Sequence, residues 1–153
     1  MEYTKDQIQD IISFVAQKWD ERLFDQAKSK FHSIVEIDYT SLGAPSVTHD
    51  PIDNLCNNWK IVLNGFDKTL HTVKVNSIET DNDLIVVHSS VNAYHFIANV
   101  QEGEEWTING HYVHKLKNID GTLKIVYMKL QVDEQQGNLK LIMESTKKTM
   151  TIQ

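Results

Sequence analysis

The chain has 153 residues, the length of one folded domain, and 41% of them are hydrophobic while 24% are charged. These fractions are typical of a globular protein and argue against a disordered or membrane-spanning chain. The formal net charge of −6 and the single arginine, Arg22, argue against nucleic-acid or anionic-membrane partners. The lone Cys56 and a polar N-terminal segment predict a cytoplasmic protein without internal disulfides. We expect a single domain over residues 1–153.

The first 30 residues have the spacing of two helices. Thr4 and Gln7 have the arrangement of a capping box, and apolar residues from Ile8 to Trp19 follow at helical intervals. A second, shorter helix is expected over residues 23–30.

A third helix is predicted after the first strand. Asp50 is expected to cap its N-terminus, with Pro51 as the first helical residue and apolar side chains at helical spacing from Ile52 to Leu63. Gly65 is expected to cap its C-terminus.

The remaining residues alternate with a period of two, which is typical of half-buried strands. Turn signals lie at 81–83, at 101–104 and at Asp120-Gly121. The stretch after Gly137 fits either a strand or a helix. The strands expected between these turns cover residues 33–39, from 69 to the first turn, 84–100, 106–117 and 123–132.

This order of elements predicts an α+β fold, in which helices pack on one face of a curved antiparallel sheet. The second face of the strands is more apolar than a solvated face requires, because it carries Val86, Val113, Val126 and Met128. This convex face is suited to packing on a second copy of the chain.

Three of the seven histidines are predicted to share the apolar face of the sheet. These are His71, His95 and His114, each from a different strand. Any one of them alone is most simply a hydrogen-bonded core residue, but several imidazoles in one apolar pocket would form a natural acid/base site. The other four fall on polar faces or in loops: His32, His49, His88 and His111.

Several short segments occur in the order and spacing of a known family. They are Trp19-Asp20, Glu36 to Ser41, Thr69-Leu70-His71, Asn92 to His95, Asn109 to His114 and Ile119 to Lys124. In these segments the chain resembles the SnoaL-like branch of the nuclear transport factor 2-like superfamily, and within it the scytalone dehydratases. The resemblance implies a cone-shaped fold, also called cystatin-like, in which the helices cover the concave face of the sheet. It also implies a cofactor-independent elimination of water from a cyclic alcohol. Together with the apolar convex face, the resemblance predicts a two-fold homodimer that packs through that face.

The resemblance also implies roles for individual residues. Asp20, Tyr39, His71 and His95 match the catalytic aspartate, a tyrosine and two histidines of that family, although Tyr94 is an alternative to His95 by raw spacing. Trp19, His114 and Leu116 replace a tyrosine, a serine and an asparagine of the family. The expected lining of the substrate pocket comprises Trp19, Tyr39, Trp59, His71, Val73, Val91, His95, Tyr112, His114 and Leu116.

We expect the Asp20 carboxylate to orient His95 and to raise its pKa, because a carboxylate fixes the tautomer of an adjacent imidazole and stabilises its charged form. The alternative role for Asp20 is the N-cap of the second helix. The alternative role for Tyr39 is packing on a half-buried strand.

Two functions from different classes fit this pattern. The first is a cofactor-independent lyase or isomerase that acts on a small cyclic or polyketide-like molecule. The second is a non-catalytic module that binds a small ligand or forms a dimer, because a fold does not determine a function. Less favoured are a partner-binding protein with an exposed apolar patch and a metal site formed by Asp20, His71, His95 and His114. No cofactor is expected.

Overall fold

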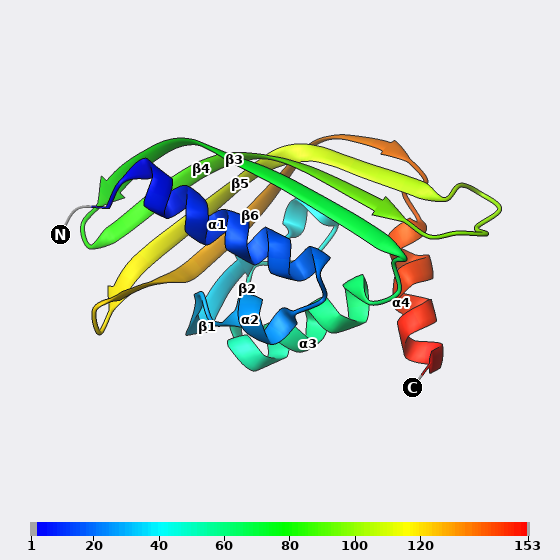
Figure 1. Ribbon diagram of the computed structural model, residues 1–153, viewed down its shortest axis with the longest axis horizontal. Helices are drawn as coiled ribbons and strands as arrows, with labels where there is room; N and C mark the ends of the chain where they lie inside the picture. Colours follow the sequence, from blue (N-terminus) through cyan, green and yellow to red (C-terminus); the bar gives the residue numbers. More distant parts are fainter. Residues whose placement is uncertain (1–2, 153) are drawn as a thin grey trace.

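The computed structural model describes residues 3–152 as one six-stranded sheet with helices on its inner side and along one edge (Figure 1). The helices are α1 (Lys5–Asp20), α2 (Phe24–Lys28), a 3₁₀ helix η1 (Thr40–Leu42), α3 (Ile52–Leu63) and α4 (Leu141–Ile152). The strands are β1 (Phe31–Asp38), β2 (Thr48–Pro51), β3 (Lys68–Asp81), β4 (Leu84–Phe96), β5 (Glu105–Ile119) and β6 (Thr122–Gly137).

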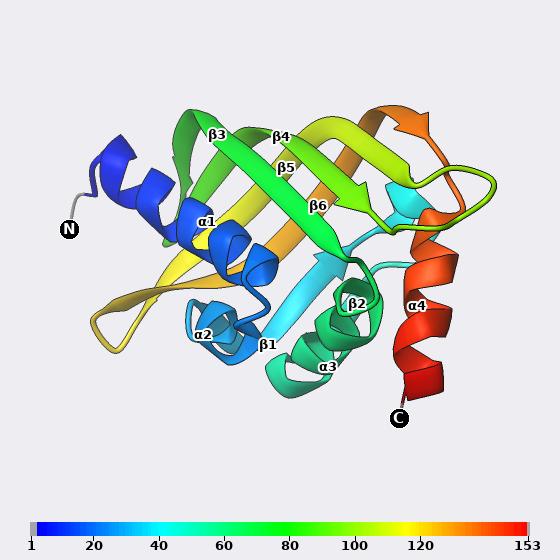
Figure 2. The same cartoon turned by 45° about the vertical axis from the view of Figure 1, so that its right-hand side comes forward.

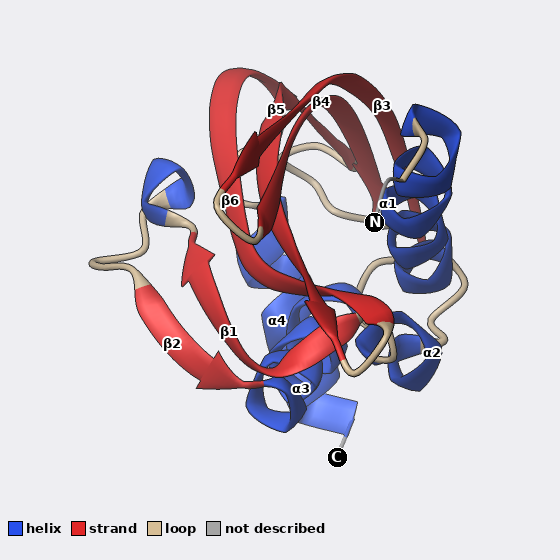
Figure 3. Cartoon of the chain, turned by 90° about the vertical axis from the view of Figure 1, so that its left-hand side faces the viewer, coloured by secondary structure: helices blue, strands red, loops and turns tan. Residues whose placement is uncertain are grey.

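The strands are ordered β2-β1-β6-β5-β4-β3, and β3 to β6 form long antiparallel hairpins. The sheet curves strongly, with α1 alongside β3, while α3 and α4 lie beneath its hollow (Figure 2). Figure 3 shows the curl of the sheet from one end. The predicted α+β fold is confirmed, except that β1 pairs with β6 in parallel. A parallel pair needs a long connection between its strands, and here that connection contains the three hairpin strands.

The capping box at the start of α1 is confirmed, because Gln7 N donates to Thr4 Oγ1 at 3.1 Å and Thr4 N donates to Gln7 Oε1 at 2.8 Å. The hairpin turn at Asp120-Gly121 is also confirmed. Both residues have positive φ, 53° and 90°, as a tight two-residue turn between twisted strands requires.

Both predicted caps of α3 are wrong. Asp50 lies in strand β2, where it accepts a hydrogen bond from Thr48 Oγ1 at 2.9 Å, and α3 begins after Pro51 without a side-chain cap. Gly65 does not have the positive φ of a glycine that caps a helix, and a residue without a side chain is required here for a different reason. A Cβ atom at this position would lie 1.9 Å from the carbonyl oxygen of Ser145 in α4.

The C-terminal segment, for which strand and helix were both open, is helix α4. Ser145 Oγ donates to the Val62 carbonyl of α3 at 2.6 Å, and Lys148 pairs with Asp67 at 2.8 Å. Leu141 at the start of α4 is fully buried. The last helix is therefore fixed against α3 and the turn that follows it.

One predicted side-chain orientation is reversed by a β-bulge in β6. Leu116 pairs with Ile125 but Lys115 pairs with Tyr127, so that Val126 is an extra residue and the alternation shifts. Met128, expected on the convex face, is consequently fully buried.

Within residues 3–152, no helix is long and apolar enough to cross a membrane.

Candidate active site

A cavity of about 480 Å³ lies between the concave face of the sheet and the helices α3 and α4. This volume is in the usual range for small-molecule pockets. Its wall is mostly aromatic and aliphatic, with a few polar groups. Seven of the expected residues border it: Trp19, Tyr39, Trp59, His71, Val91, His95 and Tyr112.

Three expected lining residues lie elsewhere among the described residues. Val73 lies under helix α1, which holds it through a hydrogen bond from Gln9 Nε2 to its carbonyl. His114 and Leu116 lie beyond Tyr112 along β5, and their exposed fractions are only 2% and 0%. The alternation correctly predicted that both side chains point inward, but the cavity does not extend along the whole of β5.

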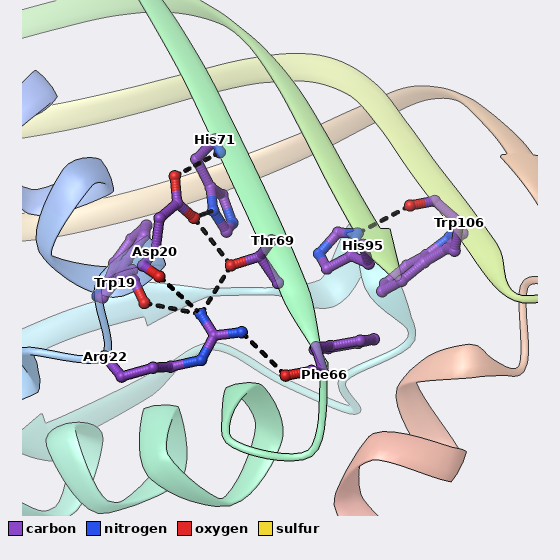
Figure 4. Close-up of polar contacts among 8 residues, drawn as sticks. All are labelled: Trp19, Asp20, Arg22, Phe66, Thr69, His71, His95 and Trp106. Atoms are coloured by element: carbon purple, nitrogen blue, oxygen red, sulfur yellow. Dashed lines mark hydrogen bonds and ion pairs between the residues drawn. The ribbon is translucent and has the colours of Figure 1, made fainter. Parts of the chain in front are cut away.

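The Asp20 carboxylate at the end of α1 binds His71 of β3, the strand that lies alongside α1. Asp20 Oδ1 lies 2.7 Å from His71 Nδ1, and Asp20 Oδ2 accepts the backbone N–H of His71 at 2.8 Å (Figure 4). A carboxylate can only accept, so Nδ1 carries a proton, and in the neutral imidazole Nε2 therefore carries the lone pair. His71 borders the cavity, whereas Asp20 lies behind it.

The expected pairing of Asp20 with His95 is wrong. His95 Nδ1 instead lies 3.0 Å from the carbonyl oxygen of Trp106. His95 belongs to β4, one strand farther from α1 than β3, and neighbouring strands are about 4.8 Å apart. The short Asp20 side chain therefore reaches His71 first. Asp20 also does not cap α2, whose N-cap is Leu23 without a side-chain hydrogen bond.

His95 and His71 nevertheless lie on the same face of the sheet, with their ring centroids 5.8 Å apart. His95 stacks on Trp106 at a centroid distance of 4.3 Å. Burial, together with the nearby His71, lowers the pKa of His95 to about 4. His95 is therefore neutral near pH 7, with Nδ1–H directed at the Trp106 carbonyl and Nε2 as a hydrogen-bond acceptor.

The two tyrosines of the cavity wall are hydrogen-bond donors at neutral pH. Burial raises the pKa of the Tyr39 hydroxyl and that of the Tyr112 hydroxyl well above the ordinary value. For Tyr112, the nearby Tyr39 and Asp20 act in the same direction. Tyr94, the alternative to His95 by raw spacing, instead donates to Glu105 at the opposite face of the sheet.

Two tryptophans complete the wall beside His71. The Trp19 ring contacts the His71 ring edge-on at a centroid distance of 5.5 Å. The Trp19 ring also contacts the Trp59 ring edge-on, at a centroid distance of 5.4 Å. Their indole nitrogens are buried without a hydrogen-bond partner within residues 3–152.

No three His, Cys, Asp or Glu side chains within residues 3–152 are grouped as metal ligands. The four-residue metal site considered above is therefore not formed: Asp20 binds His71, and His114 lies outside the cavity wall.

Sequence reasoning missed several lining residues. Trp106 and Ile108 alternate inward on β5, so parity could have identified them. Phe66 follows α3 in a turn and Ile142 lies on α4, where no strand alternation exists to place them. The missed lining residues include Ile37, Phe66, Trp106, Ile108, Leu130 and Ile142.

Solved structures with the same fold are numerous. The Kfla4162 protein from Kribbella flavida matches with a TM-score of 0.82 and 18% identity over 91% of this chain and 96% of that chain. A protein assigned as a scytalone dehydratase from Novosphingobium aromaticivorans matches with a TM-score of 0.72 and 17% identity, over 86% and 85% of the two chains. The hexachlorocyclohexane dehydrochlorinase LinA-type3 from Novosphingobium barchaimii matches with a TM-score of 0.69 and 16% identity, over 86% and 87%.

At these identities the likeness establishes the fold alone. No protein with curated annotation matches the chain significantly. The sequence model of the SnoaL-like domain family matches residues 4–129 of this chain, from the capping box of α1 into β6. Most of the chain is thus covered, and α4 lies beyond the matched residues. The chain belongs to the SnoaL-like domain family of the nuclear transport factor 2-like superfamily.

Proposed function

We propose that this protein is a cofactor-independent lyase that removes a proton and a leaving group from a small cyclic, largely apolar molecule. The observation that carries this proposal is the Asp20–His71 pair at the wall of an apolar cavity. The pair places a fixed basic nitrogen beside a space from which bulk water is largely displaced by substrate.

His71 acts as the general base. Its Nε2 takes a proton from a substrate carbon next to an activating group, the C–H electron pair forms a double bond, and the bond to the leaving group breaks. The imidazolium that forms is stabilised by the Asp20 carboxylate 2.7 Å from Nδ1. If the leaving group is a hydroxyl on the same face, the Nε2 proton passes to it and water is released.

The other polar groups of the wall suit a substrate that has a carbonyl and a hydroxyl. Tyr39 and Tyr112 donate hydrogen bonds and can stabilise charge that develops on a carbonyl oxygen. Neutral His95 accepts a hydrogen bond from a substrate hydroxyl. The same groups would serve an isomerase, in which His71 returns the proton to another carbon, so the product distinguishes the two reactions.

The names of the structural neighbours support an elimination. One is assigned as a scytalone dehydratase and another is a dehydrochlorinase. Both names describe the removal of a small molecule from a substrate, which is the reaction that the Asp20–His71 pair can perform here.

The test is turnover of a panel of cyclic β-hydroxy ketones and chlorinated rings. It is followed by the absorbance of the new conjugated double bond for the ketones and by the release of chloride for the chlorinated rings. Asp20→Asn should lower turnover by about 10²–10⁴-fold, because the amide no longer stabilises the imidazolium. Asp133→Asn is the matched control. It alters a second histidine–aspartate pair, His111 Nδ1 to Asp133 Oδ2 at 2.5 Å, which is about half exposed and does not border the cavity.

Full turnover by Asp20→Asn would refute the mechanism. Tight binding of panel members without turnover by the wild type would instead favour the non-catalytic binding module.

A further inference from the structure

The only arginine of the chain lies directly behind the Asp20–His71 pair. Arg22 Nη1 donates to Thr69 Oγ1 at 2.7 Å and to the Trp19 carbonyl at 2.9 Å, and Nη2 donates to the Phe66 carbonyl at 3.2 Å. Its φ of 63° is a conformation that few residues other than glycine adopt. The guanidinium thus joins the end of α1 to the beginning of β3 (Figure 4).

These contacts fix the direction of the Thr69 hydroxyl. A guanidinium has only donors, so Thr69 Oγ1 must accept from Arg22. Its single proton is then free for Asp20 Oδ1, 2.9 Å away. The Asp20 carboxylate therefore receives three hydrogen bonds: one from Thr69, one from the His71 backbone and one from His71 Nδ1.

We infer that Thr69 and Arg22 are positioning residues for the elimination, and that they hold Asp20 in the orientation that fixes the His71 tautomer. This inference rests on the proposed function. Neither residue borders the cavity, and Thr69 is only 4% exposed, so both act through Asp20 rather than on the substrate.

Replacement of the Thr69 hydroxyl tests this role directly. Thr69→Val keeps the shape of the side chain and removes the hydroxyl group that donates a hydrogen bond to Asp20 Oδ1. We expect kcat to fall by about 10–100-fold, the usual effect of losing a hydrogen bond behind a reactive group, with KM unchanged. Thr69→Ser keeps the hydroxyl and should restore kcat. Thr149→Val is the matched control, because it removes a buried hydroxyl of α4 that has no partner within residues 3–152.

A double-mutant cycle separates positioning from general damage to the fold. Arg22→Lys keeps the positive charge but not the planar fork that reaches four acceptors, namely Thr69 Oγ1 and the carbonyls of Trp19, Asp20 and Phe66. If Arg22 acts through Thr69, the double variant Arg22→Lys, Thr69→Val should be about as active as the weaker single variant. The inference would be overturned if the fold-losses of kcat in the two single variants multiplied in the double variant. It would also be overturned if Arg22→Lys lowered kcat while Thr69→Val kept the wild-type kcat. If Thr69→Val is poorly folded, Thr69→Ala can replace it in the cycle, because alanine also lacks the hydroxyl that joins Arg22 to Asp20.

A readout without turnover keeps this inference distinct from the proposed function. The His71 Nδ1 proton should give a downfield NMR signal, which Asp20→Asn identifies by its loss. Thr69→Val should shift or broaden this signal, while Thr69→Ser and Thr149→Val should leave it in place. An unchanged signal in Thr69→Val would refute the positioning role. A changed signal in a protein that turns over no panel member would refute only the proposed elimination.

Discussion

The two buried histidines of the inner face should make the protein sensitive to acid. Burial lowers the pKa of His114 to about 3, and its Nδ1 has no hydrogen-bond partner within residues 3–152. Burial and the neighbouring His71 lower the pKa of His95 to about 4. An unfolded histidine titrates near 6.5. Below this pH the unfolded state therefore binds more protons than the folded state, and stability is lost as the pH falls from about 6.5 toward 4.

The magnitude follows from these pKa values. At about pH 4.5 an unfolded histidine is almost fully protonated, while His114 in the folded state is almost fully neutral. Proton binding then favours the unfolded state by about 2–3 kcal/mol for each of the two histidines. The sum of about 5 kcal/mol equals the whole stability of many domains.

The assay is urea unfolding of the wild type and of His114→Leu at about pH 7 and about pH 4.5. Leucine fills a similar volume and cannot be protonated, so the loss of stability between the two pH values should shrink by about 2–3 kcal/mol. His49→Leu makes the same change at a side chain that is 68% exposed, and should leave the loss unchanged. Equal losses for the wild type and His114→Leu would refute the assignment of acid sensitivity to His114.

Three further outcomes are expected. Gly65→Ala should destabilise the protein to urea by at least about 1–3 kcal/mol, because its Cβ would lie 1.9 Å from the Ser145 oxygen; a wild-type midpoint would contradict this packing. Tyr39→Phe should lower turnover by about 10²-fold at an unchanged melting temperature, and unchanged turnover would remove Tyr39 from the reaction. The expected two-fold dimer predicts twice the chain mass by sedimentation equilibrium at micromolar concentration, and a mass of one chain would contradict it.

The sequence predicted the architecture well because most strands are half-buried and alternate strictly. Val91 and His95 on β4 were placed inward by parity alone, and they border the cavity. The alternation failed where the backbone departs from it. A bulge inserts Val126, and no pattern in residues 123–132 marks an extra residue, so Met128 was assigned to the wrong face.

Elements that depend on tertiary contacts were harder to predict. The segment after Gly137 has a weak local pattern, and α4 is held by contacts that a sequence does not display, such as the bond from Ser145 to the Val62 carbonyl. Gly65 was interpreted as a helix cap because that is the commonest reason for glycine after a helix. Its actual reason is the close approach of a helix that begins 76 residues later.

The partner of Asp20 is the clearest example of a contact that the sequence alone could not predict. Parity turned both His71 and His95 toward the concave face, and the family resemblance carried both as catalytic residues without deciding which one the carboxylate binds. The choice depends on where α1 ends relative to the edge of the sheet. At this edge Arg22 and Thr69 join the last turn of α1 to the first residues of β3. A carboxylate fixed over the edge strand reaches His71 and leaves His95 to the Trp106 carbonyl. In the proposed mechanism, one inward histidine is thus oriented as the base, and the other is a neutral hydrogen-bond acceptor.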